Sequence, residues 1–225
     1  MRFRSTAAIA ASLALALGAT ACGGDNEPTG GGAAAEQEQP KATPSPVAQI
    51  DQLTGRTTAV ALDEAFVEAL TMLKVTPGPV GDAKITKKGS AVFPITGGNV
   101  TYYEPGTVSP YVQGNIEHTG SGLSLEAGGK TVELVDFVVD PGASVLTGTV
   151  MLDGEEAAPA GTPLFFLDGR TLNPLEAKDN GTAVLQGTTV KLKAEAADLL
   201  NQTFEIDALK EGLEIGVATI TVNTQ

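Results

Sequence analysis

Residues 111–139 read YVQGNIEHTGSGLSLEAGGKTVELVDFVV, and this stretch decides the fold class. Residues 111–117 and 123–126 are short and strand-like, and the glycine pair at 128–129 marks a turn after them. Residues 131–139 are apolar on both faces toward the end of the segment, which indicates a central or bulged strand. The stretch therefore predicts consecutive strands joined by tight turns, with no helix between them.

The pattern of short strands extends over most of the chain from residue 50 on. Further strand-like segments, bounded by Gly, Pro, Asn or Asp, are expected at residues 57–62, 92–95, 100–103, 145–152, 163–167, 183–193 and 213–222. A turn is expected at Thr96-Gly97-Gly98-Asn99. About nine to eleven strands at hairpin-like spacing, without long crossover helices, argue against a parallel α/β sheet.

Only two segments have a helical period. In the first, Asp63 can cap a helix that runs to about Leu73, with Phe66 and Leu70 on one face. The second runs from about residue 194 to residue 204 and also has one apolar face. The sequence therefore predicts a mainly β domain, an antiparallel sandwich or a barrel-like sheet, with two short helices.

The N-terminus has the composition of an export signal. Arg2 and Arg4 precede an apolar run over residues 7–17, which is shorter than the roughly 20 residues that a membrane span needs. The small residues 18–21 then precede Cys22, the only cysteine, in a pattern that resembles a bacterial lipobox. That resemblance implies a signal peptide over residues 1–21 and a diacylglycerol on the Cys22 thiol.

One position in this motif leaves an alternative open. Ala19 stands three residues before the cysteine, where the lipobox usually has Leu or another large aliphatic residue. An ordinary signal peptide, cleaved after residues 19–21, would leave Cys22 as a free thiol. The expected location is the extracytoplasmic face of the cell membrane, with the lipid as anchor.

Composition divides the remaining chain into a tether and a domain. Residues 22–49 are rich in Gly, Pro, Ala, Glu and Gln, which predicts a flexible tether, and residues 50–225 suit one β-rich domain. Removal of Arg2 and Arg4 leaves 12 of the 14 basic residues against 27 acidic ones, a net charge of −15. Such a surface repels phosphates, so the prediction excludes nucleic acid as a partner. An envelope protein, a glycan and a small ligand stay open as partners.

Four side chains cluster along two consecutive strand-like segments. They are Tyr102, Tyr103, Tyr111 and His118. A tyrosinate could ligate haem iron, with His118 as its hydrogen-bond partner or as a second ligand. The alternative is aromatic packing across the strands around a buried, hydrogen-bonded histidine. These residues are candidate ligand-binding residues, and no cofactor is predicted from them alone.

Catalytic patterns are weak throughout the sequence. A Ser–His–Asp arrangement would have to use His118, and no Gly-x-Ser-x-Gly element lies between a strand and a helix. With one His and one Cys, the sequence offers no credible set of zinc ligands. A glycan hydrolase needs two converging carboxylates, for which the sequence offers Asp136, Asp140, Asp153, Glu155, Glu156 and Asp168. The prediction is a non-enzyme, with glycan hydrolysis left as a minor alternative.

Several motifs from Phe93 onward resemble an uncharacterised actinobacterial secreted family that is distantly related to the HtaA-type haem-uptake domain. They are Phe93-Pro94-Ile95-Thr96-Gly97-Gly98, Gly114-Asn115-Ile116-Glu117-His118-Thr119-Gly120, Leu123-Ser124-Leu125, Leu192, Ala196-Ala197, Leu200-Asn201, Phe204 and Gly216-Val217-Ala218. The likeness covers about 130 residues in the same order and implies a β-rich fold. HtaA-type domains hold haem through a tyrosinate with the help of a histidine, so the resemblance also implies haem binding.

This chain departs from that pattern at the residues that would hold haem. Ser121 stands where the HtaA-type histidine would be, and His118 lies where the family usually has an aromatic residue. The family's tyrosine lies near a Trp, and this chain has no Trp. The leading prediction is therefore a lipid-anchored, non-catalytic binding or scaffolding module, with haem or small-ligand capture as the alternative. A deep apolar cleft flanked by a tyrosine would favour capture.

Overall fold

The computed structural model describes residues 44–224, so the predicted signal peptide, Cys22 and most of the tether lie outside the described residues. Thirteen strands form one sheet in this part of the chain. The strands are β1 (Ala48–Ile50), β2 (Arg56–Leu62), β3 (Thr76–Gly81), β4 (Lys84–Ile85), β5 (Ser90–Pro94), β6 (Gly97–Tyr102), β7 (Val112–Ala127), β8 (Lys130–Asp140), β9 (Val145–Leu152), β10 (Glu155–Asp168), β11 (Glu176–Lys178), β12 (Thr182–Leu192) and β13 (Glu214–Asn223). The helices are α1 (Glu64–Met72), α2 (Ala194–Phe204) and the short 3₁₀ helix η1 (Gly169–Thr171).

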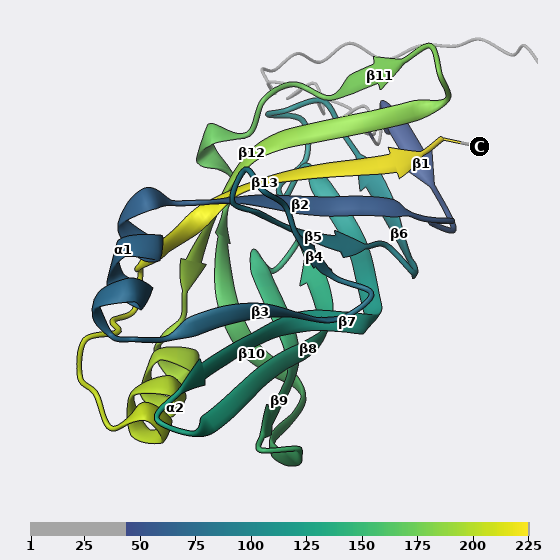
Figure 1. Cartoon of the computed structure of the whole chain (residues 1–225). Helices are drawn as coiled ribbons and strands as arrows, with labels where there is room; N and C mark the ends of the chain where they lie inside the picture. Colours follow the sequence, from purple (N-terminus) through teal and green to yellow (C-terminus); the bar gives the residue numbers. More distant parts are fainter. Residues whose placement is uncertain (1–43, 225) are drawn as a thin grey trace, which may run out of the picture. The chain divides into compact units, whose positions relative to one another are not determined.

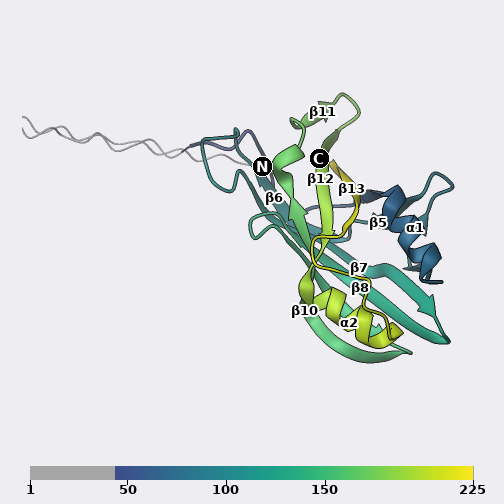
Figure 2. The same cartoon turned by 90° about the vertical axis from the view of Figure 1, so that its left-hand side faces the viewer.

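The sheet is antiparallel and strongly curled (Figures 1 and 2). Its strand order is β1-β6-β7-β8-β9-β10-β12-β13-β2-β5-β4, with β11 paired to β12 and β3 paired to β7 beside this path. Long strands such as β7 and β8 are shared between the two ends of the molecule. The mainly β prediction is confirmed, and of the two predicted architectures the curled, barrel-like sheet is the one observed.

Both predicted helices are present. Asp63 caps α1, because its Oδ1 accepts from the backbone N–H groups of Ala65 at 2.9 Å and Phe66 at 3.3 Å. The apolar face of α1 buries Phe66 and Leu70, and the apolar face of α2 buries Leu200. Neither helix, nor any other in residues 44–224, has the length and apolarity to cross a bilayer. Figure 1 shows both helices away from the β11–β12 hairpin.

The strands differ from the sequence prediction in three places. The segments at 111–117 and 123–126 belong to the single 16-residue strand β7, whose register against β8 shifts between His118 and Gly122. The turn expected at residues 96–99 is wrong, because β6 already begins at Gly97. Four short strands were not predicted, β1, β3, β4 and β11. Of these, β3 contains Pro77 and Pro79, which are tolerated because it lies off the main strand path.

Two residues close the seam of the curled sheet. The sheet does not close by a continuous ladder, because β5 and β6 belong to opposite arms of the strand order. Between these strands, the Ile95 N–H donates to the Arg56 carbonyl at 2.6 Å, and the Thr96 N–H donates to the Glu117 carbonyl at 2.8 Å. The tight link between β5 and β6 therefore holds the arm that contains β2 against the arm that contains β7.

The part of the interior toward the helices is closely packed. Leu134 and Leu164 are 2% and 0% exposed there. Phe137 lies between Phe93 and Phe165, with ring centroids 5.3 Å and 6.5 Å away in edge-to-face geometry. We call this part the packed end.

Candidate functional site

An apolar cavity of about 450 Å³ occupies the other end of the curled sheet, which we call the open end. Its walls come from eight strands and carry Val60, Val100, Val112, Ile116, Val139, Leu146, Leu167, Ala183, Leu185, Val190, Ala218, Ile220 and Val222. Its mouth is formed by loops that carry Ser109, Pro110, Tyr111, Pro141, Ser144, Gly169, Arg170, Leu172 and Leu175. A chamber of this volume, with few polar groups, has the size and character of small-molecule sites.

Strand alternation explains why these side chains face inward. On β13, Ala218, Ile220 and Val222 are every second residue, so all three share one face. On β12, Leu185 and Val190 both line the cavity although their spacing is odd. A register shift at Gly187 makes this arrangement possible, because one extra residue restores the inward face after the bulge.

Small side chains explain why this end stays hollow. Ala183 and Ala218 face the cavity from neighbouring strands, where Leu or Phe would fill it. The sheet is therefore lined at this point by residues that leave space, as in barrels that hold a small ligand.

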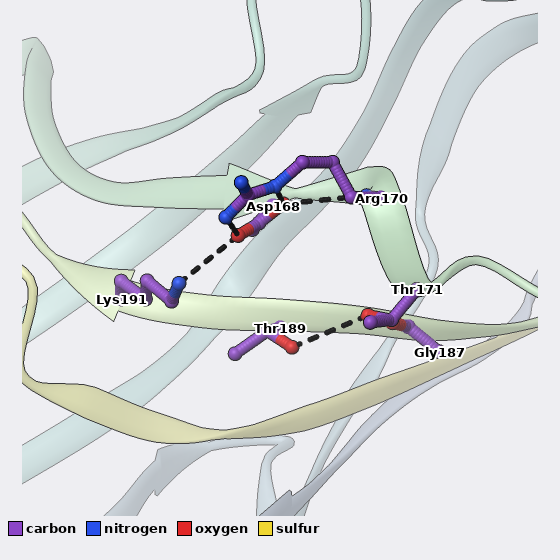
Figure 3. A network of polar contacts seen from close by, with 6 residues as sticks. All are labelled: Asp168, Arg170, Thr171, Gly187, Thr189 and Lys191. Carbon is purple, nitrogen blue, oxygen red and sulfur yellow. Dashed lines mark hydrogen bonds and ion pairs between the residues drawn. The ribbon is translucent and has the colours of Figure 1, made fainter.

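A cluster of charged side chains around Asp168 lies on the outer face of β10 and β12 (Figure 3), opposite to the inward-facing pair Leu167 and Val190. The Asp168 carboxylate accepts from Arg170 Nε at 2.8 Å, from Arg170 Nη2 at 2.6 Å and from Lys191 Nζ at 2.9 Å. It also accepts from the Arg170 backbone N–H at 3.2 Å, which starts η1. The Arg170 and Lys191 donors hold the pKa of the Asp168 carboxyl well below its usual value. Its acceptor positions are fully used.

Gly187 holds the mouth loop on β12. The Thr171 hydroxyl donates to the Gly187 carbonyl at 2.6 Å (Figure 3). Gly187 has φ +114°, and a Cβ there would meet the Thr171 carbonyl oxygen at 2.3 Å. Sequence reasoning missed this residue, although a glycine that interrupts a strand pattern is a recognised sign of a bulge. It also named Asp168 only as one of the carboxylates considered for hydrolysis, and it did not name Arg170 or Lys191.

The three predicted tyrosines lie near the mouth. Tyr111 lines the cavity and packs edge-to-face on Tyr102, with ring centroids 5.8 Å apart. Tyr102 is buried, whereas Tyr103 is partly exposed and donates its backbone N–H to the Tyr111 carbonyl at 2.8 Å. Burial, and then the neighbouring Tyr102 phenol, raise the pKa of the Tyr111 hydroxyl. This environment disfavours a tyrosinate.

His118 lies apart from the tyrosines, buried at the seam. Its side chain is 1% exposed and does not line the cavity. Nδ1 lies 2.8 Å from the Pro94 carbonyl oxygen and must donate to it, so Nε2 of the neutral ring accepts from the Thr58 hydroxyl at 3.2 Å. Burial lowers the pKa of His118, and the bond to the Pro94 carbonyl opposes this. His118 therefore links β7 to β2 and β5.

The predicted tyrosine and histidine do not converge on one point. Seven residues of extended chain separate Tyr111 from His118, which is roughly 20 Å at about 3.3 Å per residue. Thr58 lies between His118 and the cavity, since it lines the cavity and bonds to the ring. In residues 44–224 no group of three or more His, Cys, Asp or Glu side chains could hold a metal ion. These side chains do not fit the ligand set that haem iron needs.

The carboxylates considered for hydrolysis serve local structure instead. Asp136 accepts from the Gly120 N–H at 2.8 Å, Asp140 from the Ala143 N–H at 2.8 Å, and Asp153 from the Thr131 N–H at 2.8 Å. Glu155 and Glu156 are exposed at the start of β10. Only Asp168 of this group lines the cavity, so the cavity wall does not offer two carboxylates for a glycosidic bond.

Comparisons with known proteins give a likeness of fold. No family model and no curated protein matches the sequence. Among solved structures, the C-terminal domain of HtaA from Corynebacterium glutamicum has a TM-score of 0.53 and 13% identity, over 76% of this chain and 98% of that domain. The haem-binding protein HtaB from the same organism has a TM-score of 0.45 and 12% identity, over 79% of this chain and 96% of that protein.

The likeness to the HtaA domain spans nearly all of that domain, at an identity that carries information about the fold alone. It agrees with the resemblance seen in the sequence motifs from Phe93 onward. The weaker likeness to HtaB adds nothing to this conclusion. The described part of this chain therefore has a fold that distantly resembles the HtaA-type domain.

Proposed function

We propose that this chain is a non-catalytic binding module that captures a small, largely apolar ligand in the cavity at the open end. The observation that carries the proposal is the apolar cavity of about 450 Å³, in a domain whose other end is closely packed. Keeping such a space empty costs stability, since apolar side chains there forgo packing contacts. A bound apolar molecule would supply those contacts.

The site of action in this proposal is the outer face of the cell membrane. The support is the sequence of the leader, with Arg2 and Arg4 before an apolar run and small residues before Cys22. A diacylglycerol on Cys22 would hold the module at the membrane, and the composition of residues 22–49 suits a tether. Mass spectrometry of the mature protein tests this directly: a free thiol on Cys22, in protein recovered from the medium, would contradict the anchor.

Ligand capture is tested by filling the cavity. Ala218→Leu adds a larger side chain inside it, whereas Ala61→Leu makes the same change on the exposed face of β2. With the fluorescent apolar probe 1-anilinonaphthalene-8-sulfonate, we expect the purified chain to bind, Ala61→Leu to bind as well as the parent, and Ala218→Leu to bind at least tenfold more weakly. Equal binding by all three proteins would contradict the proposal.

Haem capture is the second candidate function. Tyr111 lines the cavity, and a phenolic oxygen is one of the groups that ligate haem iron. The raised pKa of Tyr111 and the bonded state of His118 weigh against it. Addition of haemin to the purified chain distinguishes the cases. A shifted Soret band that is lost in Tyr111→Phe would favour iron ligation, and an unaltered spectrum would exclude it.

A further inference from the structure

We propose that the captured ligand is an uncharged apolar molecule whose polar group, a hydroxyl or a carbonyl, forms a hydrogen bond with the Thr188 hydroxyl inside the cavity. This inference rests on the proposed function and adds the chemical class of the ligand and the residue that orients it. Three features of the cavity wall support it: the inward direction of Thr188, the unused hydrogen-bonding capacity of its hydroxyl, and the outward direction of the charged side chains nearby.

The bulge at Gly187 turns Thr188 into the cavity and Thr189 away from it. Thr188 is paired with Ala218 across the β12–β13 ladder, and cross-strand partners share a face of the sheet. Ala218 is 5% exposed and lines the cavity, as Thr188 does. Thr189 is paired with Asp168 on β10 and therefore lies on the outer face with it. Without the extra residue at the bulge, the alternation along β12 would reverse the directions of the two threonines.

The Thr188 hydroxyl keeps its hydrogen-bonding capacity for a ligand. No side-chain hydrogen bond within residues 44–224 involves it, whereas the residues on either side of it both contact the Thr171 hydroxyl. The other threonine of the cavity wall, Thr58, already donates its hydroxyl to His118 Nε2 at 3.2 Å. A hydroxyl can donate one hydrogen bond and accept two, so Thr188 can pair with a hydroxyl or with a carbonyl oxygen. The remaining lining hydroxyls belong to loops of the mouth, at Ser109, Tyr111 and Ser144.

No charged side chain of residues 44–224 points into the cavity. Asp168 and Arg170 belong to the lining, but the Asp168 side chain shares the outer face with Thr189, opposite to Leu167. The Arg170 guanidinium is held on that face by the Asp168 carboxylate, and its side chain is 83% exposed. Burial raises the pKa of the Tyr111 hydroxyl, so the phenol at the mouth is neutral. The interior therefore offers a charged ligand no counter-ion.

An uncharged ligand suits this interior because of solvation. A charge that leaves water for an apolar space without a partner loses far more solvation free energy than a neutral hydroxyl or carbonyl does. A neutral group recovers most of its loss through one hydrogen bond. The net charge of the chain, −13, adds repulsion for anions. An ionic ligand would therefore keep its charged group in the water at the mouth, with less of its apolar body inside the cavity.

The first experiment compares three ligands that share one unbranched alkyl chain, namely 1-decanol, decanoate and decylammonium. Isothermal titration calorimetry at neutral pH measures the dissociation constant of each with the purified chain. We expect 1-decanol to bind about tenfold more tightly than either ion, because leaving about two CH₂ groups outside the cavity costs roughly that much affinity. Binding of either ion within about threefold of 1-decanol would overturn the proposal. This comparison does not depend on any variant folding.

The second experiment tests Thr188 with a matched pair of variants. Thr188→Val and Thr189→Val each replace a hydroxyl by a methyl group, on the inner and the outer face of the same strand. We expect Thr188→Val to bind 1-decanol about fivefold more weakly, the loss of one neutral hydrogen bond, and Thr189→Val to bind it as the parent does. Apolar contact alone predicts the opposite sign, because valine makes the wall more apolar.

Urea unfolding of both variants checks that each is folded under the conditions of the titration. Unchanged or tighter binding of 1-decanol by folded Thr188→Val would overturn the assignment of Thr188. An equal loss in both variants would overturn it as well, because the outer-face hydroxyl cannot reach the ligand.

The outcomes separate this inference from the proposed function. The probe 1-anilinonaphthalene-8-sulfonate can bind with its rings in the cavity and its sulfonate in the water at the mouth, so its binding tests capture alone. If this probe binds and an alkyl ion matches 1-decanol, or 1-decanol does not bind, ligand capture stands and the uncharged class is wrong. If 1-decanol, both ions and this probe all fail to bind, the proposed function itself is wrong.

Discussion

The packed end and the open end are built by the same curled sheet, and they differ in the size of the side chains that point inward. At the packed end the sheet places Leu134, Leu164 and three phenylalanines against each other. At the open end, inward positions carry mainly Val and Ala. Strand alternation sets which residues face inward at both ends, and residue volume decides whether the interior is filled.

His118 lies at the boundary between the two ends. On the packed side its ring lies 6.3 Å from the Phe93 ring, and on the open side it bonds to Thr58, which lines the cavity. A buried polar ring suits this position, because the seam brings the Pro94 carbonyl to a place where it would otherwise lack a partner. The histidine that looked like a ligand in the sequence has a structural role that its bonds explain.

The largest contrast between the two ends is expected from truncating a leucine in each. Leu134→Ala leaves an enclosed void at the packed end and should reduce the free energy of unfolding by about 3 kcal/mol. Leu185→Ala only widens a cavity that already exists and should cost about 1 kcal/mol, the loss for a partly buried residue. Urea unfolding of both variants measures the difference. Equal losses would mean that the open end is packed as tightly as the other.

The bulge that shapes the open end gives the next largest effect. Gly187→Ala forces a Cβ against the Thr171 carbonyl oxygen in a left-handed backbone conformation. We expect a loss of about 2 kcal/mol in stability, from backbone strain and displacement of the mouth loop. Gly181→Ala is the control, since Gly181 has φ +73° with no atom within 4 Å of a Cβ. It should lose about 1 kcal/mol. A loss in Gly187→Ala no greater than in the control would contradict this account.

The boundary itself can be tested through pH. Burial lowers the pKa of His118, so the unfolded chain takes up a proton at a higher pH than the folded chain. Stability should therefore be unaffected above the unfolded pKa of about 6.5 and fall as pH drops below it, by at most about 1.4 kcal/mol per pH unit. His118 is the only histidine, so no other imidazole contributes. His118→Gln should flatten the curve between pH 7 and 5, and parallel curves would refute the assignment.

The regular elements were readable from the sequence because their signals are local. Asp63 before an apolar period of four residues predicted α1, and glycine pairs predicted the hairpin between β7 and β8. The turn at residues 96–99 failed for a non-local reason. Residues 97–98 pair with β7, and the chain instead passes from one arm of the sheet to the other at Ile95 and Thr96, whose N–H groups donate to the two different arms.

The cavity and its mouth depend on contacts that a linear pattern does not encode. Strand alternation places Ala218 and Ile220 on one face, but predicting a hollow interior requires knowing which residues meet across the curled sheet. The ion pairs of Asp168 with Arg170 and Lys191 also depend on the fold, because the pairing of β10 with β12 brings the three side chains together. Tyr111 was named as a candidate for its chemistry, whereas its place in the cavity wall and its raised pKa come from the fold.

The smallest expected change in stability comes from adding volume at the open end. Ala218→Leu places three more carbon atoms where space exists, so the free energy of unfolding should change by less than about 0.5 kcal/mol, whereas Ala197→Leu overfills the packed end and should cost about 1–3 kcal/mol. Ala197 is 2% exposed and Ala218 is 5% exposed, so burial alone predicts similar costs for the two substitutions. Thermal and urea unfolding of both variants therefore separate burial from packing. A large loss in Ala218→Leu would mean that the cavity closes in solution, and its apolar walls would then have each other, rather than a ligand, as their partners.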